Sequence, residues 1–224
     1  ALNLLPPDGR DLILAAALIS VAIGLPAGTY AAIRRDGPFD RIASALAGLS
    51  LAIPVFVVGT LMVMIFAQVL RWVPAGGFVP FERDPVQHLV LLAMPAITIA
   101  SSLLPVLFRM TRSSVLDVML KDYVRTARAK GVAPLRIMTH HVVRTALMPI
   151  ITVLALHLGT LLGGTVLVEY VFNWPGLSGL LVGAVNARDY PEVVGVVLVI
   201  SIMFVLLNLM VDILYGLIDP RVRR

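Results

Sequence analysis

Long uncharged stretches dominate the pattern of polar and apolar positions along this chain. Five of them are at least 19 residues long and consist mainly of aliphatic residues. A bilayer core about 30 Å thick needs about 20 consecutive apolar residues in a helix, so each stretch is long enough to cross a membrane. The five predicted spans are Leu12–Ile33, Ile42–Leu70, Leu89–Phe108, Thr145–Val168 and Val193–Val211.

A sixth uncharged stretch, Tyr170–Ala187, has a different character. It contains Asn173, Trp174 and Pro175 together with several glycines. Backbone of this kind is tolerated at membrane depth only where protein or water covers it. We therefore predict a re-entrant or interfacial segment here. The expected fold class is an all-α integral membrane protein, with residues 1–224 as a single transmembrane domain.

Composition supports this class. The 224 residues are 59% hydrophobic and 14% charged, whereas an average soluble domain is about 45–50% apolar and about 25% charged. Mean hydropathy is +0.95. The chain has no cysteine, which excludes a disulfide scaffold and a cysteine-based metal site.

Charge gives the expected orientation. Most of the 18 Lys and Arg residues lie in Arg34–Arg41, Arg109–Arg144 and Arg221–Arg224, and basic loops favour the cytoplasmic side. The N-terminus is then outside, and the C-terminus is cytoplasmic. A sequence pI near 10.1 can indicate nucleic-acid binding, but these charges flank spans and accompany no nucleic-acid motif. We expect contact with membrane lipid and none with nucleic acid.

Small and polar residues within the spans suggest packing and transport roles. Gly24 with Gly28, and Gly159 with Gly163, have the spacing that lets helix backbones approach closely. We interpret both pairs as packing within the chain, with a dimer face as the alternative. Polar side chains inside a membrane are functional candidates, with a helix–helix hydrogen bond as the alternative. The candidates for a translocation path are His157, Asn208, Ser101 and Ser102.

The cytoplasmic segment 112–144 carries the most specific pattern. Val115, Met119, Tyr123 and Ala127 recur at helical spacing beside a charged face, which predicts an amphipathic helix. Gly131 suits a left-handed helix end, and Pro134 suits the first turn of a second helix. An amphipathic helix lying on anionic lipid is the simpler alternative. A rigid projecting corner better fits a docking element for a cytoplasmic partner.

Two sequence motifs in and after this segment resemble the loop of a known protein family. Asp122–Gly131 reads DYVRTARAKG and His140–Pro149 reads HHVVRTALMP. Both are similar to the loop of permease subunits in bacterial binding-protein-dependent ABC importers, and most similar to the B-type subunit of the dipeptide, oligopeptide and nickel branch. Trp72–Gly77, Glu169–Ser178 and Arg188–Pro191 resemble the same branch. The broader superfamily loop often begins Glu-Ala-Ala, where Arg125-Thr-Ala stands here.

The resemblance implies a mechanism and partners. Family members have a further N-terminal span, and this chain starts outside without a delivery signal, so we expect an upstream segment. A homologous C-type permease would pair with this chain, and two ATP-binding cassette ATPases would supply hydrolysis of ATP with Mg. An extracytoplasmic substrate-binding protein would deliver cargo at the inner (plasma) membrane of a bacterium. The residues expected to couple ATPase closure to alternating access are Asp122, Tyr123, Arg125, Ala127, Gly131, Pro134, Leu135 and Arg136.

The remaining expectations concern chemistry and cargo. The chain has no Gly-Lys dipeptide, so it lacks a phosphate-binding loop, and we expect no enzymatic activity and no bound cofactor or metal. Asn173, Trp174 and Tyr190 are candidates for an external face toward cargo or binding protein. Peptide is the first choice of cargo and nickel the second. A secondary transporter and a membrane scaffold without transport are the alternatives of another class.

Overall fold

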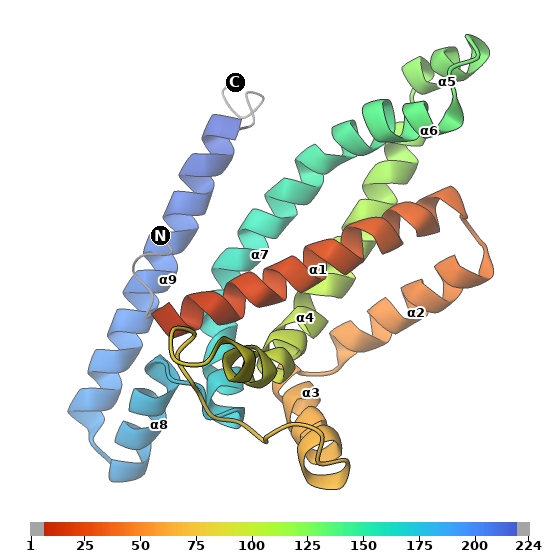
Figure 1. Cartoon of the computed structure of the whole chain (residues 1–224). Helices are drawn as coiled ribbons and strands as arrows, with labels where there is room; N and C mark the ends of the chain where they lie inside the picture. The colour runs from red at the N-terminus through yellow and green to blue at the C-terminus, as the bar shows by residue number, and fades with distance from the viewer. Residues whose placement is uncertain (1–6, 219–224) are drawn as a thin grey trace. The chain divides into compact units, whose positions relative to one another are not determined.

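The computed structural model describes residues 7–218, which form helices and loops without a strand. Side chains are not described at residues 7–8, 158–160, 162–164, 177–178, 204, 207–208 and 210–218. The α-helices are α1 (Pro7–Ile33), α2 (Pro38–Ala52), α3 (Val55–Met62), α4 (Pro85–Met119), α5 (Asp122–Ala129), α6 (Pro134–Arg136), α7 (Arg144–Val171), α8 (Leu177–Ala187) and α9 (Tyr190–Ile218) (Figure 1). Two π-helical segments, η2 (Val63–Val69) and η3 (Ile137–Val143), continue α3 and α6.

The all-helical membrane fold expected from the sequence is confirmed. Three described helices are long and apolar enough to cross a membrane, namely Gly9–Ile33, Pro85–Met119 and Pro134–His157. The number rises to four if the bent pair Pro38–Ala52 and Val55–Val69 is one span. In the last helix the described apolar part is the shorter segment Tyr190–Met203. The exact count of five spans stays a prediction.

The stretch Ile42–Leu70, which we predicted to be one span, is interrupted in its middle. The helix stops at Ala52, Ile53 and Pro54 are non-helical, and a new helix starts at Val55. Pro54 explains the break, because proline has no N–H to donate and disfavours helical backbone at the residue before it. The stretch is therefore a broken span or a re-entrant loop.

Contacts group the chain into two compact units. Unit 1 comprises residues 1–17, 53–101 and 156–224, and unit 2 comprises residues 18–52 and 102–155. We describe each unit by itself. The expectation of a single transmembrane domain over the whole chain stays a prediction.

Tight corners connect the last three helices of unit 1. After α7, Asn173 adopts a left-handed conformation (φ 49°), and the N–H groups of Asn173 and Trp174 donate to the carbonyls of Tyr170 and Glu169. This pattern is a Schellman motif, in which asparagine replaces the usual glycine. Arg188 (φ 56°) ends α8 in the same way, so that α8 and α9 form a helical hairpin (Figure 1).

Unit 2 is held together by close packing between α1 and α4. A Cβ on Gly24 would lie 3.2 Å from the Leu107 side chain, and one on Gly28 would lie 2.6 Å from the carbonyl oxygen of Phe108. Only glycine allows this approach. Packing within the chain is thus confirmed for this pair, whereas Gly159 and Gly163 lie outside the described side chains. A small core of Ala31, Ala47 and Phe108 continues the contact.

Candidate functional site

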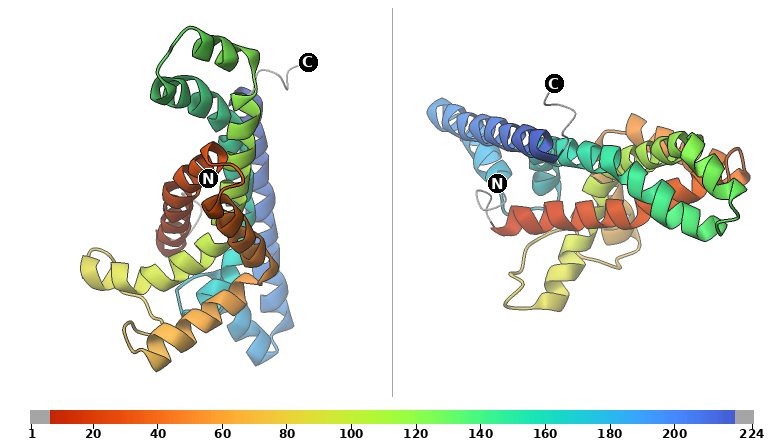
Figure 2. Two further views of the ribbon diagram at one scale, coloured as in Figure 1. Left: turned by 90° about the vertical axis from the view of Figure 1, so that its right-hand side faces the viewer. Right: turned by 90° about the horizontal axis from the view of Figure 1, so that it is seen from above.

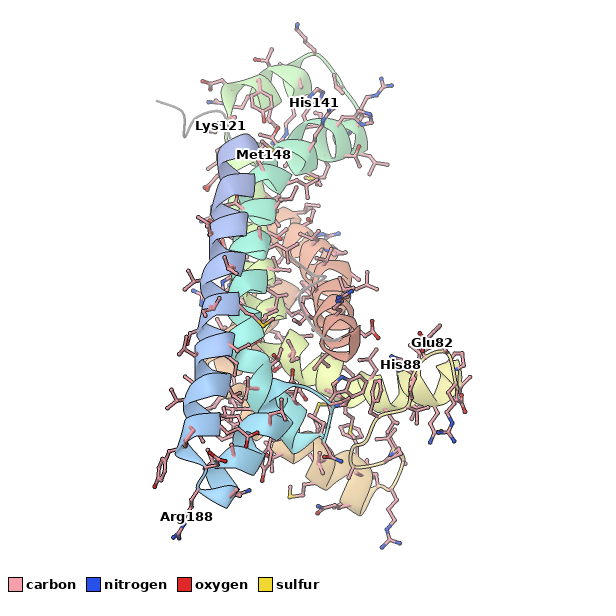
Figure 3. The ribbon with its side chains drawn as sticks, turned by 90° about the vertical axis from the view of Figure 1, so that its left-hand side faces the viewer. Glu82, His88, Lys121, His141, Met148 and Arg188 are labelled. Carbon is pink, nitrogen blue, oxygen red and sulfur yellow. The ribbon has the colours of Figure 1, made fainter. Side chains whose placement is uncertain are left out.

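The arm of unit 2 that we predicted to be cytoplasmic consists of two helices where we predicted one. The helix carrying Val115 is the end of α4, which stops at Met119, and α5 begins at Asp122. Between them Lys121 is extended (φ −69°, ψ 145°). Asp122 then lies in the first turn of α5, where a carboxylate interacts favourably with the helix dipole. The arm therefore bends before the corner that we expected at Gly131 (Figure 3).

The predicted glycine corner is present. Gly131 has a φ of 75°, and its N–H donates to the carbonyl of Arg128 (3.0 Å). The N–H of Val132 donates to the carbonyl of Ala127 (3.2 Å). Together these bonds form a Schellman motif with Gly131 at the left-handed position, where an L-residue with a Cβ is strained. The corner thus has a defined backbone geometry.

The second helix of the corner starts at Pro134, as expected, but it does not end before the next span. Pro134 is the first residue of α6, which passes without interruption into η3 and then into α7. Figure 2 shows α5 as a short helix folded back beside this continuous one. The corner is therefore joined to α7 by an unbroken helical backbone.

A small buried core orders the corner and leaves its candidate residues at the surface. Val124 of α5 is buried, as are Ile137 and Val142 of η3, and α5 contacts η3. Tyr123 Oη donates to Thr145 Oγ1 (3.5 Å) across the same junction. The exposed candidates are Asp122, Tyr123, Arg125, Gly131, Pro134, Leu135 and Arg136, whereas Ala127 is half-buried. The structure thus brings the predicted coupling residues together on one projecting element.

Leu135 is the most exposed apolar candidate of the corner, with 76% of its surface accessible. Basic residues surround it in the sequence, including Arg128, Lys130 and Arg136. An apolar side chain held on an ordered, positively charged tip is suited to enter a groove on a partner that has an acidic rim.

The candidates for a translocation path lie on three helices. Ser101 and Ser102 are half-buried in α4, and Ser101 Oγ donates to the carbonyl of Thr98 (2.6 Å). His157 is half-buried in α7. The side chain of Asn208 lies outside the described residues. Their role in transport stays a prediction.

The three candidates for the external face differ in their exposure. Asn173 and Tyr190 are exposed. Trp174 is only 3% exposed, and its ring packs edge-on against Phe78 and His88 with centroid distances of 5.1 and 5.7 Å. Trp174 therefore acts as an internal support of the loop that carries Phe78 and not as an open contact surface.

His88 is a central residue of unit 1 that was not among the predicted site residues. Its ring is buried at the start of α4, and its Nδ1 donates to the carbonyl of Val79 (2.8 Å). Its Nε2 lies 3.8 Å from the Asp11 carboxylate, and Phe81 packs against the ring. Figure 3 shows His88 near the loop that carries Glu82. No spacing rule joins the aromatic residues of this loop to His88 in the sequence.

The motif Trp72–Gly77 has a structural explanation within the same unit. A Cβ on Gly76 would collide with the carbonyl of Phe172, and the N–H of Gly77 donates to that carbonyl (2.9 Å). A Cβ on Gly176 would likewise collide with the carboxylate of Glu169, which is buried. Backbone therefore excludes a side chain at Gly76, and at Gly176 a side chain would displace the buried carboxylate.

A buried ion pair in unit 2 was also missed by the sequence reasoning. Arg112 donates through Nε and Nη2 to the two carboxylate oxygens of Asp40 at 2.5 and 2.7 Å. Asp40 is 3% exposed. The two residues are 72 positions apart, so no local pattern relates them.

Comparison with known proteins assigns this architecture to a family. The family described as "Binding-protein-dependent transport system inner membrane component" matches residues 24–224. The chain belongs to this family. It is 40% identical to the di/tripeptide transport system permease protein DppB of Pseudomonas aeruginosa over 97% of this chain. It is 41% identical to the glutathione transport system permease protein GsiC of Escherichia coli K12 over 91% of this chain.

The chain spans 70% of the length of DppB and 64% of the length of GsiC. Two solved structures share the fold of this permease family. An inward-facing MetNI methionine ABC transporter matches with a TM-score of 0.70 and 17% identity, covering 93% of this chain and 91% of that chain. An amino acid ABC transporter with histidines matches with a TM-score of 0.63 and 16% identity, covering 92% and 88%.

Membership in the permease family decides against two alternatives that the sequence analysis left open, namely a secondary transporter and a membrane scaffold without transport. It also agrees with the resemblance of the signature loop. Within the part of the chain that the structure describes, no group of three or more His, Asp or Glu side chains could hold a metal ion. The exposed pair His140 and His141 thus has no third ligand among these residues.

Proposed function

We propose that this chain belongs to the translocation path of an ATP-driven importer of small peptides, and that it pairs there with a homologous C-type permease subunit. The observation that carries the proposal is the corner at Gly131, an ordered element that presents Leu135 outside its own fold. A corner of this kind needs a partner to act on it, because the permease carries no phosphate-binding loop of its own.

The partner that fits the corner is an ATP-binding cassette ATPase, of which two copies would hydrolyse ATP with Mg beneath the membrane. Closure of the ATPases would move α5 and α6, and α7 would follow because it continues α6 and η3 without a break. The energy for alternating access comes from tighter binding of the ATPases to one of the two permease conformations. The corner then lies on the cytoplasmic side, with the N-terminal end of this chain outside and the C-terminus cytoplasmic.

Small peptides are the proposed cargo. The similar permeases carry the names of di/tripeptide and glutathione systems, and glutathione is itself a tripeptide. The nickel alternative has no such relative among them, and we no longer favour it. An extracytoplasmic substrate-binding protein would deliver the peptide to the outer loops near Asn173 and Tyr190.

The docking step can be tested by replacing Leu135 in the assembled transporter. Leu135→Asp should lower the affinity for tagged ATPase subunits about tenfold or more, since truncating one central interface residue often has that effect. Val86→Asp is the matched control, because Val86 is 72% exposed and belongs to unit 1. ATPase capture on beads measures the affinity. Equal capture by the two variants would contradict docking through Leu135.

Cargo can be tested separately in proteoliposomes that contain the complete transporter and its binding protein. Uptake of radiolabelled dipeptides and glutathione should depend on ATP and compete with unlabelled peptides. Uptake of radiolabelled nickel ions without any peptide uptake would contradict the proposed cargo and leave the docking proposal intact.

A further inference from the structure

The carboxylate of Asp40 accepts four hydrogen bonds, two of them from Arg112. Arg112 donates two hydrogen bonds to the carboxylate in the fork geometry that fixes a guanidinium in one plane. The N–H of Asp36 adds a bond to Oδ2 (2.9 Å), and Ser44 Oγ adds one to Oδ1 (3.3 Å). Asp40 is 3% exposed and Arg112 27% exposed at the side chain.

Stability alone does not explain such a pair. Removing two charges from water is expensive, and apolar residues of similar volume are often equally stabilising in their place. An ion pair with two hydrogen bonds supplies something that apolar packing lacks, namely a fixed distance and orientation between the helices that carry it. Here these helices are α2 and α4, which are far apart in the sequence.

The position of the pair relates it to the cytoplasmic arm. Arg112 lies about two helical turns before Met119, the last residue of α4. Only Leu120 and Lys121 separate α4 from α5. On the α1 side, Gly28 packs against the backbone of the same part of α4. The end of α4 is therefore held by α1 through close packing and by α2 through the ion pair.

We propose that Asp40 and Arg112 are positioning residues that clamp the start of α2 to the end of α4, and so to the α4–α5 arm. With the clamp closed, α1, α2 and the arm move as one body when an ATPase moves the corner. With the clamp broken, α5 moves while α1 and α2 lag, so ATP is hydrolysed without full transport. The proposal rests on the proposed function of the corner as the ATPase docking element.

The experiment compares variants of the complete transporter, with its binding protein, in proteoliposomes. Asp40→Asn keeps the shape of the side chain and removes its charge, and Arg112→Lys keeps the charge and removes the fork. The double variant Asp40→Asn with Arg112→Gln removes both charges, so that none is left buried without a partner. Asp117→Asn is the matched control, because it also removes one carboxylate charge from unit 2 and Asp117 is exposed.

ATP hydrolysis, glutathione uptake and ATPase co-purification are measured on the same preparations. We expect uptake per ATP to fall about tenfold in Asp40→Asn, in Arg112→Lys and in the double variant, with co-purification retained. Asp117→Asn should match the wild type. A purely structural role predicts that the double variant restores uptake per ATP, because it relieves the unpaired charge.

Restoration in the double variant would therefore overturn the clamp. A wild-type ratio of uptake to ATP hydrolysis in the assembled single variants would overturn it as well. Absence of ATPase co-purification in the wild-type transporter is a different result, since it would refute the proposed docking function instead.

Discussion

The left-handed backbone at Gly131 allows the effect of a substitution to be estimated from geometry. A Cβ placed on Gly131 would meet no atom within 4 Å, so steric collision contributes nothing. The whole effect of Gly131→Val is then backbone strain at a φ of 75°, which costs about 1–2 kcal/mol for an L-residue. Strain of this size raises the ratio of open to closed corner about 5- to 30-fold.

Limited proteolysis of the purified transporter in nanodiscs measures this ratio. Trypsin cleaves after Arg128 and Lys130, which are exposed and immediately precede the corner, and cleavage of a transiently opened segment follows its population. We expect Gly131→Val to be cleaved about 5- to 30-fold faster than the wild type. Gly131→Asn should lie between them, because asparagine tolerates left-handed backbone.

The control is Gly195→Ala in α9. A Cβ there also meets no atom within 4 Å, but the backbone is helical with no positive φ. Alanine suits such a position better than glycine, so cleavage at the corner should stay at the wild-type rate. If Gly131→Val were also cleaved at the wild-type rate, the backbone at Gly131 would not hold the corner closed.

Two further substitutions test the packing of each unit by thermal unfolding of the purified transporter. Gly28→Ala places a Cβ 2.6 Å from the carbonyl oxygen of Phe108 and should lower the free energy of unfolding by about 1–3 kcal/mol. Gly48→Ala is the control, because a Cβ there meets no atom within 4 Å. Equal melting temperatures of the two variants would contradict the close approach of α1 and α4. Trp174→Ala removes a buried ring and should lower the free energy of unfolding by about 3–5 kcal/mol. Trp72→Ala is the control and should change it little, because Trp72 is 72% exposed. An equally large loss in Trp72→Ala would contradict the assignment of Trp174 as a support.

Proline and glycine gave the most accurate local predictions from the sequence. The left-handed corner at Gly131 and the helix start at Pro134 both occur as expected, because these residue types restrict or permit backbone angles independently of the rest of the fold. Hydrophobic length likewise predicted an all-helical membrane protein, since the bilayer sets the number of residues in a span.

Periodicity was less accurate where a helix breaks. The apolar rows through Val115 and Tyr123 continue across Lys121, although the backbone there is extended. A hydrophobic pattern reports which face of a segment is covered, and two successive helices can share a face. At Pro54 the proline signal was visible, but a kink within a span and a break between two helices have the same sequence pattern.

Long-range contacts were beyond the reach of the sequence. In the sequence, Asp40 is an acidic residue within the basic segment Arg34–Arg41. Arg112 is one of many basic residues, and the preference of basic loops for the cytoplasmic side already accounted for them. Only the fold joins them. His88 was missed for a similar reason, since its partners Val79, Asp11 and Trp174 come from three separate segments.

The π-helical segment Ile137–Val143 has a consequence for the direction of the docking tip. Each residue of an α-helix turns the chain by about 100° and advances it by about 1.5 Å, whereas a π-helix fits more residues into each turn. The number of residues in η3 therefore sets the direction of Leu135 around the helix axis, relative to the faces of α7. If η3 changed into an α-helix, the tip that carries Leu135 would rotate about the helix axis and move away from α7 along it. The residues that form the tip would stay the same.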